Sequence, residues 1–322
     1  MVVGEGLWAL PGLVDAHAHL AAAELVYRPG VLEGAMQRAR DSLAAGVTLV
    51  LDKGWTDDIT IQAMNALPED ERPEFEAAAK IIASRDGHFP NFALEVDDAG
   101  LENAVRGQAE AGAGWVKLIG DWPRRGIGPV ANFDQTQLRI AVDVAEAHGA
   151  KVAIHTMARE VPSMAVSAGV HSIEHGLFLE EDDLGPLGER NGMWVPTLLR
   201  CEATLRQLGE DSSGGKLFAE GLERIERLLP LAVEAGVRVL AGTDLVGSPA
   251  NVASEALRLA AYGLSGAQVV AAVSTSALVA AGRETGFEVG APGNAVWFAD
   301  DPVEAPGVLA HPSHVLRLGR LL

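Results

Sequence analysis

An alternation between short apolar runs and longer segments with helical periodicity constrains the fold of this chain more than any other feature. It predicts parallel strands joined by helical crossovers, because parallel neighbours cannot be connected by a tight turn. Predicted helices at residues 33–45, 134–147 and 218–235 each end at or beside a glycine, which suits the left-handed position that follows a helix. The predicted strands are eight: residues 13–19, 48–52, 78–84, 115–119, 152–156, 172–175, 193–197 and 239–243.

Eight strand and helix units over roughly 240 residues match the size of a TIM barrel. We therefore expect an α/β fold in which residues 11–285 form a (β/α)8 barrel. The alternative is a doubly wound open sheet. That fold should carry a glycine-rich phosphate loop after its first strand, and no such loop follows here.

The two ends of the chain have a different texture. The segments NAVWF and HVLRL, separated by proline-rich turns, predict a β meander. With residues 7–10 they are expected to build a small, reduced β-sandwich from residues 1–10 and 286–322. Within the chain, the stretch EDSSGGK at residues 210–216 predicts a flexible segment, either a lid or a surface loop.

Charge and cysteine content exclude several classes of partner. The 44 acidic residues outnumber the 25 Lys and Arg residues, so a broad surface for nucleic acid is not expected. The single cysteine, Cys201, excludes an internal disulfide and fits a reducing compartment. The start of the chain lacks the basic region of a secretory signal, and no apolar run reaches the roughly 18 residues of a membrane span. We expect a cytoplasmic protein without a membrane partner.

His17 and His19 end the first predicted strand, in the segment PGLVDAHAHL. Residues two apart in a strand share a face, so both side chains point to the same side. We expect that side to be the barrel interior, with Val14, Ala16 and Ala18 facing the helices. A lone histidine there would be an ordinary core residue, whereas two in H-x-H spacing favour a pair of metal ligands.

Four further polar residues stand at or near the carboxyl ends of predicted strands. Lys117 lies in WVKLI, His155 in AIHT, His175 in SIEH and Asp244 in AGTD. Taken singly, a buried lysine could pair with an acid, and an Asp after Gly-Thr is often a helix N-cap. Barrel enzymes build their sites on the face where strands end, so the recurrence predicts one shared site.

These motifs resemble a known family when they are taken in order. PGLVDAHAHL, AGVTLVLD, WVKLI, AIHT, SIEHG and AGTD look like the amidohydrolase superfamily, specifically its imidazolonepropionase-like and prolidase-like branch, over residues 10–301. In that branch a proton is moved by the final Asp. The resemblance implies a set of metal ligands: His17, His19 and Asp244 for one divalent ion, His155 and His175 for a second, and a carboxylated Lys117 bridging both.

The donor types agree with that implication. Imidazole and carboxylate suit zinc, our default, although they also admit manganese, iron or cobalt. Burial lowers the pKa of a lysine and so supplies the neutral amine that captures CO₂. We expect a metal to polarise a scissile carbonyl, a bridging hydroxide to attack it, and Asp244 to carry the proton to the leaving nitrogen. This predicts cleavage of an amide or cyclic amide C–N bond in a small molecule: an N-acyl amino acid, a dipeptide-like compound or a lactam.

Three alternatives to amide hydrolysis remain at this point. The same hydroxide could open a lactone or another ester. The mononuclear deaminases of the superfamily resemble one another in having a Glu near the histidine of strand five. This chain has Met157 and Ala158 at that place, in HTMARE. A non-catalytic scaffold would lack metal ligands, and here every ligand position is filled.

Substrate contacts are less constrained by the sequence. The segment SRDGHFP resembles the branch's glycine-glycine-histidine loop, in which the histidine contacts the substrate carbonyl, so His88 is a catalytic candidate or else a solvated loop residue. The other candidates for the pocket wall and for a carboxylate clamp are Trp55, Trp122, Arg124 and Arg200. Arg124 could equally form a solvated pair with Arg125. We expect a small-molecule substrate and allow for a homo-oligomer.

Overall fold

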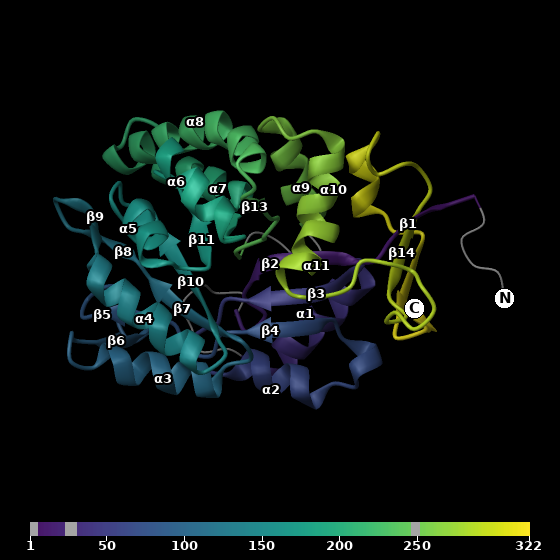
Figure 1. Ribbon diagram of the computed structural model, residues 1–322, viewed down its shortest axis with the longest axis horizontal. Coiled ribbons are helices and arrows are strands. Elements are labelled where there is room, and N and C mark those ends of the chain that lie inside the picture. The colour runs from purple at the N-terminus through teal and green to yellow at the C-terminus, as the bar shows by residue number, and fades with distance from the viewer. Residues whose placement is uncertain (1–5, 23–30, 246–251) are drawn as a thin grey trace.

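Parallel strands at the centre of the molecule are covered by helices, in the α/β arrangement that the sequence predicts (Figure 1). The computed structural model describes residues 6–22, 31–245 and 252–322. The strands are β1 (Trp8–Leu10), β2 (Leu13–Ala18), β3 (Val47–Asp52), β4 (Glu74–Ala77), β5 (Ile82–Ser84), β6 (Leu94–Val96), β7 (Trp115–Ile119), β8 (Asp121–Arg124), β9 (Gly128–Ala131), β10 (Lys151–Thr156), β11 (Ser172–His175), β12 (Met193–Val195), β13 (Arg238–Val239), β14 (Ala295–Phe298), β15 (His314–Arg317) and β16 (Arg320–Leu321). The α-helices are α1 (Leu32–Ala44), α2 (Ile59–Ala66), α3 (Leu101–Ala111), α4 (Gln135–Ala147), α5 (Val161–Ala168), α6 (Glu181–Glu189), α7 (Leu198–Leu208), α8 (Ser213–Glu234), α9 (Val252–Ala261), α10 (Gly266–Val273) and α11 (Thr275–Ala280).

Two parallel sheets carry the central strands. One has seven strands in the order β13-β12-β11-β10-β7-β5-β6, and the other has the order β2-β3-β4. Backbone hydrogen bonds join the sheets at two places, from Ala16 N to Ala241 O at 2.9 Å and from Ala77 N to Ala113 O at 2.8 Å. The arrangement is TIM-barrel-like, and it brings the carboxyl ends of the strands to one face.

The third predicted strand, at residues 78–84, is confirmed only over Ile82–Ser84, and a strand that the sequence did not predict, β4, precedes it. β4 ends at Ala77 and pairs with β3, whereas β5 begins at Ile82 and pairs with β6 and β7. The acidic segment of β4 was missed because its charges have a partner far along the chain. Glu74 lies 2.5 Å from Arg283 Nε, and Glu76 lies 3.1 Å from Arg283 Nη1.

The first strand follows a different alternation from the one expected. Val14 and Ala16 belong to a buried cluster made mainly of strand residues such as Leu49 and Trp115, with α11 at its edge, whereas Leu13 and Ala18 belong to the larger cluster that includes most of the helices. The prediction that Val14 and Ala16 face the helices is therefore wrong. The pairing of β2 with β3 is irregular between Asp15 and Ala18, and this shift brings His17 into the site described below.

The three predicted helices are confirmed as α1, α4 and α8, and glycines with φ of +89°, +71° and +83° follow them at positions 46, 149 and 236. The loop predicted at residues 210–216 is wrong in its second half, because α8 begins at Ser213. Ser212 caps this helix by accepting a hydrogen bond from Gly215 N at 2.9 Å. A Cβ at Gly215 would collide with the carbonyl oxygen of Gly209, so packing requires glycine there.

The expected pairing of the two chain ends is confirmed. β1 lies antiparallel to β14, with Trp8 opposite Phe298 and Leu10 opposite Val296, and β15 and β16 extend the same sheet. This sheet lies to one side of the parallel strands in Figure 1. Residues 1–5 of the predicted sandwich lie outside the described residues. Within the described ranges, none of the helices has the length and apolar character needed to cross a bilayer.

Candidate metal centre

His17, His19 and Asp244 form a compact group at the ends of β2 and the segment after β13. His17 Nε2 lies 3.3 Å from His19 Nε2, and Asp244 Oδ1 lies 3.6 Å and 3.4 Å from these two nitrogens. One donor atom from each of the three residues falls within 4.8 Å of the others. His19 Nδ1 lies 2.6 Å from Gly54 O, which orients its ring. The geometry is that of a site able to hold one divalent cation.

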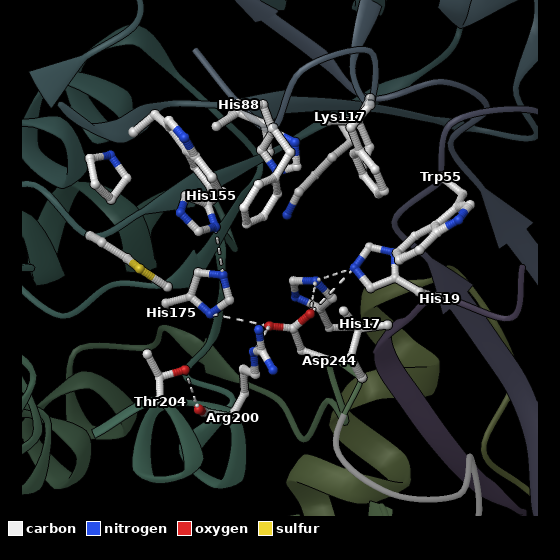
Figure 2. A pocket seen from close by; sticks show the side chains of 18 of the residues that line it. His17, His19, Trp55, His88, Lys117, His155, His175, Arg200, Thr204 and Asp244 are labelled. Atoms are coloured by element: carbon white, nitrogen blue, oxygen red, sulfur yellow. Dashed lines mark hydrogen bonds and ion pairs between the residues drawn. The ribbon is translucent and has the colours of Figure 1, made fainter. Parts of the chain in front are cut away.

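A second pair of imidazoles comes from neighbouring strands. His155 Nδ1, on β10, lies 2.9 Å from His175 Nε2, on β11. The other nitrogen of His175 lies 2.6 Å from Thr197 Oγ1, which holds this ring in place. Asp244 Oδ2 lies 3.8 Å from His175 Nδ1, so the Asp244 carboxylate lies between the two histidine groups (Figure 2).

Lys117 points its nitrogen toward the space between the histidine groups, from the side opposite Asp244 (Figure 2). The side chain is buried, and within the described part of the chain its Nζ has no hydrogen-bond partner. Burial lowers the pKa of Lys117 to about 8, although Glu174 and Asp244 act in the opposite direction. A buried amine without an acceptor is costly unless a further group completes its environment.

His17, His155 and His175 are neutral at physiological pH. Burial lowers the pKa of His17 to about 4 and that of His175 to about 3, and it lowers the pKa of His155 as well. Neutral imidazole is the form that binds a metal ion. The donor set therefore fits two divalent cations. It consists of two close pairs of imidazole nitrogens, a carboxylate between them and a buried amine without a hydrogen-bond partner among the described residues.

Unusual backbone conformations hold several of these side chains. His175, Thr197 and Asp244 have φ of +65°, +47° and +38°, in the left-handed region that non-glycine residues rarely occupy. Such strain is characteristic of functional positions. Gly242 leaves space for the His17 side chain, since a Cβ at this position would lie 2.5 Å from His17 Cβ.

A cavity of about 420 Å³ opens above the centre. All the sequence-predicted site residues except Arg124 line it: His17, His19, Trp55, His88, Lys117, Trp122, His155, His175, Arg200 and Asp244. Apolar side chains that the sequence argument did not identify complete its wall: Ile81, Phe89, Phe92, Ile119, Met157 and Phe218. This is the size and character of a site for a small molecule.

His88 belongs to an aromatic wall of this cavity. Its ring centroid lies 4.3 Å from that of Trp122 and 4.9 Å from that of Phe92. Burial, together with the charges of His19 and Lys117, lowers the pKa of His88 to about 3. Within the described residues, its buried Nδ1 has no hydrogen-bond partner. The solvated loop histidine that the sequence also allowed is therefore not what the structure shows.

Two arginines predicted to contact a substrate have different environments. Arg200 Nε lies 4.0 Å from Asp244 Oδ2, at the cavity. Arg124 is not a lining residue, and its guanidinium donates to the carbonyl oxygens of Asp86 and Arg85. The structure therefore does not place Arg124 at the cavity, where the sequence predicted it. Its guanidinium nitrogens instead hold the loop that carries His88. Arg125 is exposed.

Sequence reasoning missed several buried polar residues near the centre. Glu174, next to His175 in SIEH, lies with Oε2 2.5 Å from His17 Nδ1. Asp121 accepts backbone hydrogen bonds from Met157 and Ala158 at 2.7 Å and 2.9 Å, which holds the segment after β10. The sequence signal for these residues was an acidic residue within or beside an apolar strand motif. Such a carboxylate is buried and therefore needs specific partners.

Comparison with known proteins shows the family of this chain. The model of the amidohydrolase family matches residues 8–321. Uncharacterized proteins from Mycobacterium bovis and Mycobacterium tuberculosis are 33% identical to this chain, over 99% of it and 86% of their own length.

Solved structures share the fold at lower sequence identity. A Xaa-Pro dipeptidase with bound methionine superposes with a TM-score of 0.82 at 23% identity, covering 98% of this chain and 87% of that one. Ochratoxinase from A. niger has a TM-score of 0.82 at 19% identity, with 97% and 82% covered. The family match extends over nearly the whole chain, so this protein belongs to the amidohydrolase family and is an enzyme that hydrolyses carbon–nitrogen bonds.

Proposed function

We propose that this enzyme uses two divalent metal ions to cleave an amide or cyclic amide C–N bond in a small molecule of the N-acyl amino acid, dipeptide-like or lactam class. One observation carries the proposal. Two pairs of imidazole nitrogens, separated by 3.3 Å and 2.9 Å, face one cavity together with a carboxylate and a buried lysine.

The residues present suit the following assignment: His17, His19 and Asp244 for the first metal, His155 and His175 for the second, and a carboxylated Lys117 for both. A carbamate on Lys117 would replace an orphaned ammonium by an anion with two oxygens. When bound, the cations, zinc by default, would supply a Lewis acid for the scissile carbonyl and favour ionisation of water in the cavity.

Asp244 is the proposed proton carrier. Burial would raise its pKa, but His17, a hydrogen bond from His19 and His175 together lower it below its ordinary range. The carboxylate is therefore ionised and able to accept a proton from the attacking water. Its Oδ atoms lie within the cavity, from which the proton can pass to the leaving nitrogen.

His88 and Arg200 are the proposed substrate contacts, with Trp55 and Trp122 as apolar wall. A neutral His88 ring carries one N–H, which can donate a hydrogen bond to the carbonyl oxygen of the substrate. Arg200 can still bind a substrate carboxylate, because its contact with Asp244 is long, with 4.0 Å between Nε and Oδ2. A guanidinium at the cavity favours an anionic substrate, and the aromatic rings favour an apolar acyl group.

The direct test is a screen of N-acyl amino acids, dipeptides, lactams and lactones with protein loaded with zinc and bicarbonate. We expect release of the amine from amide substrates and two metal ions per chain by elemental analysis. Turnover of lactones alone, release of ammonia from an aromatic ring, or clearly less than two metals per chain would each contradict the proposal.

Arg200→Gln tests the carboxylate contact. We expect KM for carboxylate substrates to rise by about tenfold or more, which corresponds to one lost charge-assisted hydrogen bond. KM for the matching carboxamide substrates should stay nearly unchanged. Arg125→Gln is the control, because Arg125 is exposed and does not line the cavity. Equal KM changes with both substrates would argue against the assignment.

We also infer that residues 11–285 close into a (β/α)8 barrel, with the hydrogen bonds between the two parallel sheets as support. The division into this barrel and a reduced β-sandwich of residues 1–10 and 286–322 stays a prediction. A cytoplasmic location, the absence of nucleic-acid and membrane partners, and a homo-oligomer stay predictions as well.

A further inference from the structure

A group of charged side chains lies behind the proposed metal centre, away from solvent. Lys53, directly after β3, and Glu174, on β11, are both 0% exposed, and His17 is 1% exposed. Glu174 Oε2 lies 2.5 Å from His17 Nδ1, and Glu174 Oε1 lies 3.8 Å from Lys53 Nζ. Ser172 Oγ donates a hydrogen bond of 2.5 Å to the same Oε1.

Such a buried pair is a poor way to stabilise a fold. Removing a carboxylate and an ammonium from water costs several kcal/mol for each ion, and apolar replacements of similar volume are often neutral or stabilising. The cavity does not reach either residue, so neither contacts a substrate. The position of Glu174 against a proposed metal ligand points to a role in the site.

The contact with Glu174 determines which nitrogen of His17 carries the proton. At 2.5 Å the Glu174 carboxylate favours the tautomer of His17 that carries its proton on Nδ1, because the other tautomer would turn a nitrogen lone pair toward a carboxylate oxygen, and within the described residues neither atom has another hydrogen-bond partner. In a neutral imidazole the other nitrogen then has a free lone pair. That nitrogen, Nε2, is the one that faces His19 and Asp244.

Lys53 in turn fixes Glu174. Its Nζ lies 3.7 Å from the centroid of the Trp115 ring, a cation–π contact that holds the ammonium beside Oε1. Trp115 is anchored at its far end, where Nε1 donates to Glu76 Oε2 at 2.8 Å. The ring and the ammonium together leave the Glu174 carboxylate little freedom to rotate away from His17.

The orienting partner of His17 differs in charge from those of two other histidines. His19 Nδ1 is held by the carbonyl oxygen of Gly54, and His175 Nδ1 by the hydroxyl of Thr197, both at 2.6 Å. His17 Nδ1 has a carboxylate oxygen as its nearest partner, at 2.5 Å, whereas the nearest partner of His175 Nδ1 is the Thr197 hydroxyl and the Asp244 carboxylate is farther, at 3.8 Å. A carboxylate acceptor increases the basicity of the opposite nitrogen, which strengthens it as a ligand.

We propose that Lys53 and Glu174 are positioning residues that hold His17 with its proton on Nδ1 and so raise the affinity of the first metal site. The inference rests on the proposed metal centre. Glu174 acts through His17, and Lys53 acts through Glu174. Neither touches a reacting atom.

The first experiment measures the tautomer of His17 in metal-free wild-type protein at neutral pH. The ring ¹⁵N shifts, assigned by comparison with His17→Gln, should show a protonated Nδ1 and an unprotonated Nε2. A proton on Nε2 would overturn the proposal without any variant of Lys53 or Glu174.

The second experiment measures zinc affinity by competition with a chelator. Glu174→Gln keeps the shape but removes the charge, and it should weaken the tighter-bound zinc by about 10- to 100-fold. Lys53→Met should weaken it less. The double variant should lose less affinity than the product of the two single losses, because both residues act along one path. If the loss of zinc affinity in the double variant equals the product of the two single losses, Lys53 does not act through Glu174.

Glu76→Gln is the matched control, because Glu76 contacts the same Trp115 from its other end and does not contact the site histidines. It should change the unfolding midpoint of metal-free protein but leave zinc affinity and the His17 tautomer unchanged. If Glu174→Gln behaves like Glu76→Gln, the pair is only structural and the inference fails. If wild-type protein binds no metal, the proposed function fails instead.

Discussion

His155 Nδ1 and His175 Nε2 lie 2.9 Å apart, closer than two neutral imidazole lone pairs can approach unless a proton or a cation lies between them. Thr197 occupies the other nitrogen of His175, so His175 Nε2 is left to face its partner. Burial keeps both rings uncharged by lowering their pKa values. This pair is therefore suited to share one metal ion.

His175→Asn should remove about one metal equivalent per chain and leave the group around His17 loaded. Elemental analysis after dialysis checks this result. His148→Asn is the control, because His148 is an exposed residue after α4 and should leave both equivalents in place. Two retained equivalents in His175→Asn would show that this pair does not hold a metal.

Lys117→Met should reduce kcat/KM by at least about a hundredfold, since a bridging ligand would be lost. The lowered pKa of about 8 leaves an appreciable fraction of neutral amine at pH 8, which is the form that reacts with CO₂. Wild-type protein in ¹³C-bicarbonate should show a carbamate signal by NMR that the variant lacks, and Lys117→Ala should be partly rescued by short carboxylic acids. A variant with unchanged activity would exclude the bridging role.

Acid should destabilise the protein in part through His88. Its folded pKa of about 3 lies below the ordinary value of 6.5, so the unfolded chain binds more protons between these two values. The unfolding free energy therefore falls as pH falls from 6.5 toward 3. In chelator-treated protein, His88→Gln should reduce this slope by up to about 1.4 kcal/mol per pH unit.

Urea unfolding at pH 4, 5 and 6 measures the slope. His314→Gln is the control for this prediction, because His314 is exposed on β15 and its removal should leave the slope unchanged. An identical slope in His88→Gln and wild type would mean that His88 titrates near its ordinary pKa in the folded protein.

The thiol of Cys201 should be inert in the native enzyme. Burial raises its pKa, and the side chain on α7 is 0% exposed. A thiol reagent attacks the thiolate, so labelling should be slower in buffer than in urea by on the order of a hundredfold or more. Rates in buffer close to those in urea would show that α7, which also carries Arg200, opens readily.

Local pattern predicted the elements that depend on short-range order. The pattern of WVKLI and SIEH was sufficient to predict β7 and β11 with their observed bounds, because the backbone state of such runs follows from nearby side chains. It failed at β4, where the acidic segment is stabilised by Arg283, a residue more than two hundred positions away. It also failed at Ser213, where a serine cap and close packing outweigh the low helix propensity of two glycines.

The sequence by itself determined which donor atoms stand at or near the strand ends, because the parallel order of the strands brings Lys117, His155, His175 and Asp244 to one face of an α/β fold. Tertiary structure alone decided which of them meet. It turned His17 inward through irregular pairing, placed Glu174 and Lys53 behind it, and directed Arg124 to a neighbouring loop. These contacts depend on the relative register of strands far apart in the chain, and local sequence does not encode that register.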